Sequence, residues 1–157
     1  MQDSDIKQNF LNSMRGITST VNVISAAAEG QRHAMTATSV TSLSLDPPSM
    51  LVCINKDASL HKILLDNSNF CINVLSSLQK ELAEVCSNSE EGESRFVSES
   101  WKDQGPYIYN EDALSNIFCT KTNQVDHTSH TIFIGTVNRV INIHDMKPLL
   151  YGSVGYL

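Results

Sequence analysis

The chain has 157 residues, of which 41% are hydrophobic, 18% charged and 6% aromatic, values that are ordinary for a globular domain. Its net charge of −6 argues against a nucleic-acid partner, because nucleic-acid binders usually present a basic face. The longest apolar run, Met50 to Ile54, is too short to span a bilayer and no secretory leader is evident, so we expect one cytoplasmic domain over 1–157 that binds no membrane.

Periodicity predicts one helix and three strand-like segments in the first third of the chain. Ile6, Phe10 and Met14 recur at the four-residue interval of one helix face, and Ser4 can serve as the N-cap. β-Branched and alternating residues then favour strands, separated by a Glu29-Gly30 turn and by prolines, which cannot donate to a β-ladder. The predicted elements are a helix over 6–14 and strands over 21–28, 33–45 and 50–55.

Two further helices, with a strand between them, are predicted in the middle of the chain. The first helix covers 59–66, and the strand over 70–75 encloses a lone Asn73. Ser76 and Gln79 match a capping box at the start of the second helix. The apolar positions at helical spacing are Leu60, Ile63 and Leu64 in the first helix, and Leu75, Leu78, Leu82 and Val85 in the second.

The remainder of the chain is predicted to be mostly β. The Glu-rich segment 87–100 is expected to be a surface loop or a short turn of helix, in which the apolar pair Phe96-Val97 suggests a docking point. Strand-like runs follow over 117–119, 131–134, 137–143 and 149–151. Strands interrupted by two or three helices favour a single α+β domain built on an antiparallel sheet or barrel.

The cysteines indicate a reducing compartment. They are far apart and form no C-x-x-C pair, so they predict neither a zinc site nor a redox dithiol. We interpret them as buried thiols. The four are Cys53, Cys71, Cys86 and Cys119.

Two segments are rich in groups that bind phosphate or a flat polar ring. Six hydroxyl residues occupy ten positions from Met35 to Ser44, and such a strand suits a phosphate or a flavin ring edge, or else places threonines on a wet face. The strand-to-helix joint from Asn55 to His61 offers Ser59 as an N-cap and Lys56 as a cation, so it predicts an anion site or a plain capped turn.

Candidate ionic and proton-transfer groups lie further along the chain. Arg95 and Phe96 place a cation beside a ring in an acidic loop. His127 and His130 stand three residues apart, and on a strand they would point to opposite faces, which disfavours a shared metal. Either histidine can donate a hydrogen bond or transfer a proton near neutral pH. No nucleophile signature such as G-x-S-x-G is present, so the sequence does not support a hydrolase.

Several motifs follow one another along nearly the whole chain. They are Ala34-Met35-Thr36-Ala37-Thr38-Ser39, Thr41-Ser42-Leu43-Ser44-Leu45-Asp46-Pro47-Pro48, Val52-Cys53-Ile54-Asn55 with Ser59 and His61, Phe70-Cys71-Ile72-Asn73-Val74-Leu75, Arg95-Phe96, Gly105-Pro106, His130-Thr131-Ile132-Phe133-Ile134-Gly135 and Pro148-Leu149-Leu150-Tyr151. Their order resembles the short-chain flavin reductases, the reductase partners of two-component flavin-dependent monooxygenases.

The resemblance implies a fold and an activity. The implied fold is the FMN-binding split β-barrel, an antiparallel Greek-key barrel with two or three peripheral helices, usually assembled as a homodimer. The implied activity is transfer of hydride from NADH or NADPH to FMN or FAD, which supplies reduced flavin to a monooxygenase. FMN and NADH are slightly favoured, because the loop before Arg95 is acidic and the arginines are scattered.

Residue roles carry over position by position from the resemblance. Thr36, Ala37, Thr38 and Ser39 would line the isoalloxazine ring, and Thr41 and Ser42 would continue that wall. Asn55, Lys56, Ser59 and His61 would receive the flavin phosphate, and Arg95 with Phe96 would close over the phosphate or adenine side. His130 would be the active-site residue beside the nicotinamide, with His127 as the other possible register. No metal site is expected.

Two other functions stay open at this stage. An FMN-binding electron carrier would retain its flavin and have no nicotinamide site. A non-catalytic scaffold would keep the barrel and bind no flavin at all.

Overall fold

Strands dominate the computed structural model, which describes residues 2–143 and 147–157. The helices are α1 (Asp3–Arg15), α2 (Ser59–Asp66) and α3 (Lys80–Ser87), with a 3-10 turn η1 (Gly92–Phe96). The main sheet contains β2 (Asn22–Ala28), β3 (Gln31–Ala37), β4 (Val40–Leu45), β5 (Pro48–Asn55), β6 (Asn69–Val74), β9 (Ser115–His127) and β10 (His130–Asn142). The smaller strands are β1 (Ser19–Thr20), β7 (Trp101–Gln104), β8 (Tyr107–Asn110), β11 (Leu150–Gly152) and β12 (Gly155–Tyr156). Within these described ranges no helix is both long and apolar enough to cross a membrane.

The main sheet is antiparallel and curls into a barrel that is open along one seam. Its strand order is β3-β2-β6-β9-β10-β5-β4, so β3 and β4 are the two edges. Only Thr38 and Ser39 separate these edge strands in the sequence. Because so short a link brings the two edges of the sheet together at one end, the sheet must close on itself there and remain split beyond it. The predicted antiparallel barrel with peripheral helices is therefore confirmed.

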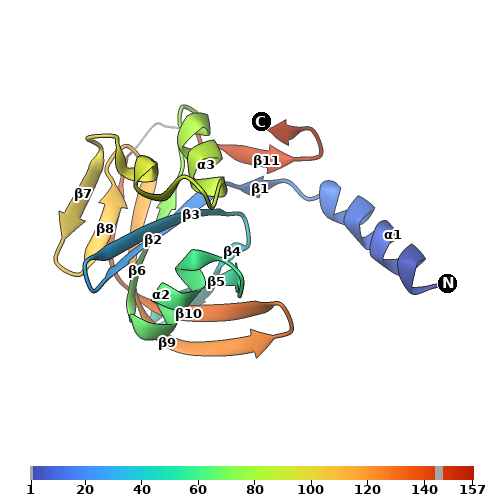
Figure 1. Ribbon diagram of the computed structural model, residues 1–157, viewed down its shortest axis with the longest axis horizontal. Helices are drawn as coiled ribbons and strands as arrows, with labels where there is room; N and C mark the ends of the chain where they lie inside the picture. Colours follow the sequence, from blue (N-terminus) through green and yellow to red (C-terminus); the bar gives the residue numbers. More distant parts are fainter. Residues whose placement is uncertain (1, 144–146) are drawn as a thin grey trace.

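Apolar side chains from the strands and α2 fill the barrel. Leu60 and Leu64 on one face of α2 pack with Ile24, Ile54 and Phe133 in one buried cluster. Figure 1 shows α2 lying between the β2–β3 hairpin and the β9–β10 hairpin. The two leucines provide the buried stripe that the sequence predicts, and the helix covers 59–66 as expected.

A polar network anchors the β7–β8 hairpin to the outer side of the barrel. Asn73 is fully buried on β6, and its Nδ2 donates to the Val23 carbonyl at 2.8 Å and to Ser25 Oγ at 2.9 Å. Its Oδ1 accepts from the Asn110 backbone N–H and from Asn116 Nδ2, each at 2.9 Å. One side chain thus joins β6 to β2, β8 and β9, and each of its polar groups is satisfied.

Several predicted boundaries are wrong for identifiable reasons. α1 begins at Asp3 with Gln2 as its N-cap, so Ser4 lies inside the helix. The segment 33–45 is two strands, because the chain turns at Thr38 and Ser39. Ser76 does not cap α3, which starts at Lys80, because Ser76 instead forms a β-bridge with Pro148.

The predicted strands of the second half are in fact longer and more numerous. The runs over 131–134 and 137–143 belong to one strand, β10, interrupted by bulges, and β9 reaches His127. The β7–β8 hairpin was missed, since its four-residue strands carry no clear alternation.

α1 projects away from the rest of the protein and none of its residues is buried (Figure 1). Its predicted amphipathic face is present, but Ile6, Phe10, Leu11 and Met14 are between 44% and 61% exposed. Exposed apolar residues at helical spacing are typical of a helix that is covered by another surface.

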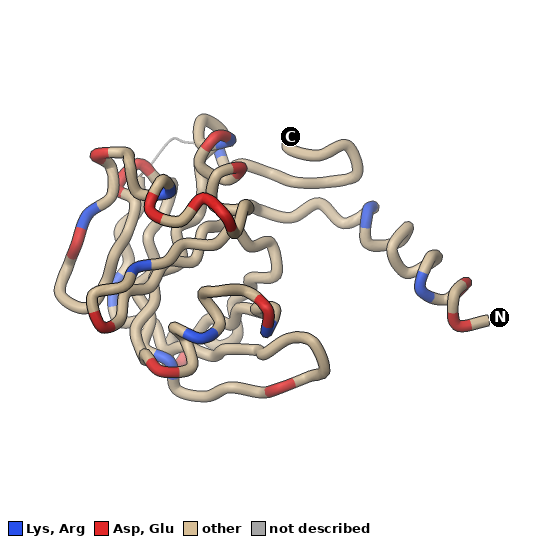
Figure 2. Tube along the Cα trace, in the orientation of Figure 1, with Lys and Arg blue, Asp and Glu red and all other residues tan. Residues whose placement is uncertain are grey.

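The charge of the protein is unevenly distributed. Residues 80–112 contain nine acidic and three basic residues, which accounts for the whole net charge of −6, while the rest of the chain has eight of each sign. Figure 2 shows the acidic positions gathering over α3, η1 and the β7–β8 hairpin. The barrel end with α2 and the β9–β10 hairpin is close to neutral.

Candidate functional site

Three adjoining hollows follow the edge strand β3. The first, of about 120 Å³, lies between β3, the start of α2, the end of α3 and η1. The second, of about 360 Å³, shares Ser87 with the first and extends to the β11–β12 hairpin. The third, of about 350 Å³, shares Thr38 and Tyr151 with the second and reaches the end of α1. We call these three hollows together the β3 groove.

Arg95 supplies the positive charge of the first hollow. It is 3% exposed, its Nη1 lies 3.0 Å from both ring nitrogens of His33, and its Nη2 donates to the Asn88 carbonyl at 2.7 Å. Its Nε is buried and has no hydrogen-bond partner. No carboxylate of the described residues forms an ion pair with Arg95, and the nearby Glu93 is bound to Arg32 at 2.8 Å. A buried guanidinium with an unused donor is suited to an anion.

The start of α2 faces the same hollow. Ser59 lines it, but the N-cap is Ala58 and no side chain caps the helix, so the predicted capping role of Ser59 is wrong by one residue. The reason is a tight turn at Asn55, whose Oδ1 accepts from the Asp57 N–H at 2.9 Å and whose carbonyl accepts from the Ala58 N–H at 3.0 Å. Amides at an uncapped helix start attract anions. The structure thus brings Ser59 and Arg95 into one hollow.

Only the first part of the predicted hydroxyl wall lines the second hollow. Thr36, Ala37 and Thr38 line it, opposite Tyr151 and Tyr156 of the β11–β12 hairpin. The Thr36 hydroxyl donates to the Ala83 carbonyl of α3 at 2.6 Å, which fixes its orientation. Thr38 is exposed at the split between the barrel edges. The hollow therefore combines small residues, hydroxyls and two aromatic rings, a lining suited to a flat polar ring.

Other predicted cofactor residues lie outside the groove lining. Thr41 and Ser42 are exposed on edge strand β4, and Ser39 is exposed in the turn before it. Asn55 is exposed at the end of β5, and Lys56 is exposed in the turn that follows. None of these residues contributes to the three hollows.

Two predicted cofactor residues are packed into the protein interior. His61 is 7% exposed, and its Nε2 lies 2.7 Å from the Thr131 hydroxyl, which donates to Asp126 at 2.8 Å. Burial lowers the pKa of His61 below its ordinary value. Phe96 packs edge-on against Trp101, with the ring centroids 4.9 Å apart, and the guanidinium carbon of Arg32 lies 4.4 Å from the Phe96 ring centroid. Neither side chain lines the groove.

His130 and His127 face each other at the tip of the β9–β10 hairpin. They are register partners across the two-residue turn, so they lie on the same face and the prediction of opposite faces is wrong. His130 is exposed, and its Nδ1 lies 2.8 Å from the Ser129 hydroxyl. It is also the register partner of Asn55, so the tip is adjacent to the loop that begins α2. The structure places the predicted active-site histidine beside the predicted phosphate loop.

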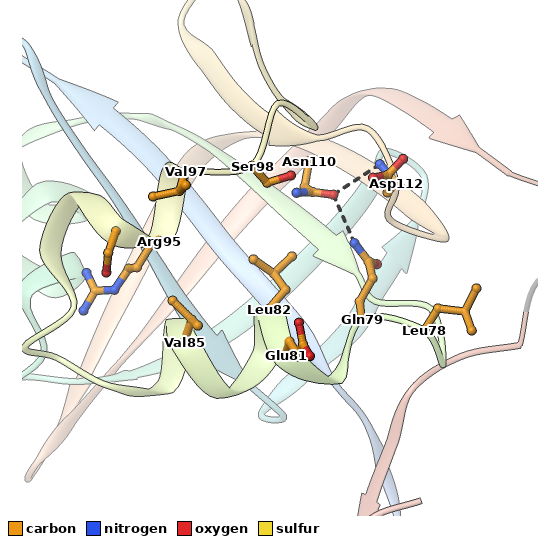
Figure 3. A pocket seen from close by; sticks show the side chains of 11 residues that line it. Leu78, Gln79, Glu81, Leu82, Val85, Arg95, Val97, Ser98, Asn110 and Asp112 are labelled. Atoms are coloured by element: carbon orange, nitrogen blue, oxygen red, sulfur yellow. Dashed lines mark hydrogen bonds between the residues drawn. The ribbon is translucent and has the colours of Figure 1, made fainter.

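A further hollow of about 400 Å³ lies on the other side of α3 (Figure 3). Gln79 there donates to Asn110 Oδ1 at 3.0 Å, and Val97 on its rim is 79% exposed. Arg95 is the only predicted site residue in its described lining, and Figure 3 shows the guanidinium pointing away from Gln79 and Asn110. The predicted docking pair is divided, because Val97 faces this hollow while Phe96 is buried.

Sequence reasoning missed much of the lining of the β3 groove, including polar and aromatic residues. His33 and Ser87 border the first hollow, and Tyr151 and Tyr156 border the second. The one sequence signal that pointed to any of these residues was the Pro148-to-Tyr151 motif, which contributed to the family resemblance. No function was assigned to the residues of that motif. His33 stands 62 residues from Arg95 in the sequence, so only the topology brings the two together.

The groove fits a phosphorylated flavin better than a metal. The first hollow is lined by the buried cation Arg95 and by an uncapped helix start, and the second offers a hydroxyl and aromatic lining. Over residues 2–143 and 147–157, no group of three or more His, Cys, Asp or Glu side chains could hold a metal ion. The Cys86 thiol in the first hollow is neutral, since burial raises its pKa to about 12.

Comparisons with known proteins agree on one family. The model of the family described as "Flavin reductase like domain" matches residues 14–156. The reductase component of the FADH(2)-dependent resorcinol hydroxylase of Rhizobium sp. is 38% identical over 155 residues, covering 96% of this chain and 86% of that one. The FMN reductase (NADH) RutF of Agrobacterium fabrum is 32% identical over 152 residues, with 94% and 86% covered. The solved structure of flavin reductase PheA2 is 30% identical, covers 100% of this chain and 97% of that one, and superposes with a TM-score of 0.86.

Proposed function

The chain belongs to the flavin reductase-like domain family, as its sequence resemblance indicated, and on this basis we propose that it is an NADH-dependent flavin reductase acting on FMN. The observation that carries the proposal is the β3 groove, where buried Arg95 and the start of α2 adjoin the hydroxyl wall. FAD and NADPH are the alternative substrates. Reduced flavin would pass to a flavin-dependent monooxygenase in the cytoplasm.

The chain's own residues bind and orient the reactants. Bound flavin supplies the ring that accepts hydride, so the protein needs no catalytic base. Arg95 and the α2 amides would hold the phosphate, and Thr38 would direct its hydroxyl toward the polar ring edge. The Thr36 hydroxyl, which donates to Ala83, could only accept there. His130, at the hairpin tip beside the α2 loop, orients the nicotinamide.

NADH oxidation followed at 340 nm tests the proposal. We expect oxidation to saturate with added FMN, because the flavin leaves the open groove after each turnover. A yellow protein that retains FMN and oxidises neither NADH nor NADPH would favour the electron carrier. A colourless protein that binds no flavin would contradict both functions.

A His130→Asn variant is expected to raise the KM for NADH about tenfold while kcat changes less than about twofold. The reason is that the substitution removes a contact that positions the nicotinamide but does not remove a proton-transfer step. Steady-state kinetics at saturating FMN measure this split. The control is His127→Asn, which alters the facing histidine of the same hairpin pair. An equal effect of the two variants, or a loss confined to kcat, would contradict the assignment to His130.

We also propose that the protein is a homodimer joined in part by α1. The support is the exposed apolar face of this helix, which nothing in the described chain covers. Phe10→Asp is expected to shift the mass measured by light scattering from twice 17.3 kDa toward 17.3 kDa. Gln8→Asp adds the same charge on the opposite face of α1 and should leave the dimer intact. A monomeric starting protein, or a dimer that survives Phe10→Asp, would refute the role of α1.

A further inference from the structure

Arg95 is held in the first hollow by few contacts. Its Nη2 donates to the Asn88 carbonyl at 2.7 Å, and its Nη1 lies 3.0 Å from the His33 ring nitrogens. The backbone of Arg95 is fixed separately, since the Trp101 indole N–H donates to the Arg95 carbonyl at 2.9 Å. The direction of the guanidinium group therefore depends on Asn88 and His33.

We propose that neutral His33 is a positioning residue that aims the Arg95 guanidinium at the flavin phosphate, an inference that rests on the flavin reductase function proposed above. His33 and Ser59 line the same hollow as Arg95, so a phosphate at the start of α2 would meet the guanidinium that His33 orients. His33 borders the phosphate end of the groove and is absent from the lining of the ring end.

The charges around His33 favour its neutral form. Burial and the adjacent Arg95 cation lower the pKa of His33 below its ordinary value. The Ala34 backbone and Glu93, which is bound to Arg32, oppose this only in part. The α3 residues in the hollow, Cys86 and Ser87, are both uncharged. A neutral imidazole keeps one bare nitrogen that accepts from Arg95, whereas a protonated ring would have no acceptor and would repel the guanidinium.

Two substitutions of similar size separate hydrogen bonding from packing. His33→Leu removes the acceptor, whereas His33→Gln retains a carbonyl oxygen that can accept from Arg95. Binding of FMN and of riboflavin, which lacks the phosphate, is measured for each variant by quenching of flavin fluorescence. Thermal unfolding is recorded in parallel, so that a general loss of folding is recognised.

The expected pattern is specific to the phosphate. His33→Leu should raise the Kd for FMN about tenfold and leave the Kd for riboflavin within about twofold, while His33→Gln stays close to the original protein for both. The KM for FMN should rise in the same proportion, with kcat preserved.

Several outcomes would overturn the inference. Equal losses for FMN and riboflavin would show that His33 acts by packing. A loss in His33→Gln as large as that in His33→Leu would exclude the hydrogen bond to Arg95. If the original protein binds FMN no better than riboflavin, the site does not bind the phosphate and the inference fails, while the proposed flavin reductase function stands. If it binds neither flavin, the proposed function fails together with the role of His33.

Discussion

An Asn73→Leu variant is expected to lose about 4 kcal/mol of unfolding free energy, because the substitution removes the centre of a buried polar network. The Asn110 backbone N–H and the Asn116 amide would both lose their acceptor, Asn73 Oδ1. The Val23 carbonyl would lose a donor on the opposite side. Each unsatisfied buried group costs roughly 1–3 kcal/mol, and leucine cannot compensate for any of them.

Urea denaturation measures the loss as a lower midpoint at an unchanged slope. Asn138→Leu is the matched control, because Asn138 also makes two side-chain bonds, to Tyr107 and Thr120, but is exposed. Water can replace those bonds, so the control should lose less than about 1 kcal/mol. Equal losses in the two variants would show that neighbouring groups or water satisfy the network without Asn73.

A Gly135→Val variant is expected to lose about 3 kcal/mol, because no space exists for a side chain at this position of β10. A Cβ atom there would lie 2.8 Å from Cζ of Phe70 and 2.9 Å from Cβ of Cys119. Phe70 is fully buried and the Cys119 Cβ is fixed by its backbone, so neither can move freely. The melting temperature should fall by about 6–12 °C for a chain of this size.

The steric origin of this loss can be tested with a double-mutant cycle. Gly135→Ala should cost less in a Phe70→Leu background than alone, since the smaller residue vacates the contact. Gly16→Ala is the control, because Gly16 ends α1 in an ordinary helical conformation and an added Cβ meets only the Ser13 carbonyl, at 3.3 Å. Strict additivity in the cycle would rule out the predicted clash with Phe70.

The spacing of apolar residues correctly predicted α2, whose buried face is set by residues close together in the sequence. The bounds of α2 follow from the spacing of Leu60, Ile63 and Leu64, and these residues indeed face the core or its edge. The start of α3 could not be predicted in this way. Ser76 matches a capping box, and Gln79 does bond the Ser76 backbone N–H at 3.0 Å, but the β-bridge to Pro148 keeps Ser76 outside the helix. A contact across 72 residues outweighed the local signal.

In the candidate site, too, some residues could be selected from the sequence, whereas others are brought together only by the fold. The resemblance selected Ser59, Arg95 and Thr36, which the structure brings to the β3 groove. The resemblance also selected His61, which is buried against Thr131. Its spacing in the sequence does not distinguish it from an exposed neighbour. His33 was missed because its relevance arises only when β3 and η1 meet. The resemblance therefore identified segments of the candidate site, and the topology decided which side chains reach the β3 groove.

The concentration of acidic residues in 80–112 affects how the reactants arrive. Flavin and nicotinamide nucleotides both carry negative phosphates, so the field of α3, η1 and the β7–β8 hairpin repels them at a distance. Their approach is thus less opposed from the nearly neutral side formed by α2 and the β9–β10 hairpin, where His130 lies and where the start of α2 borders the first hollow. Salt shortens the reach of such repulsion to about 8 Å at physiological ionic strength. Ions in the medium would therefore speed the approach of both nucleotides, whereas they slow association when protein and ligand have opposite charges.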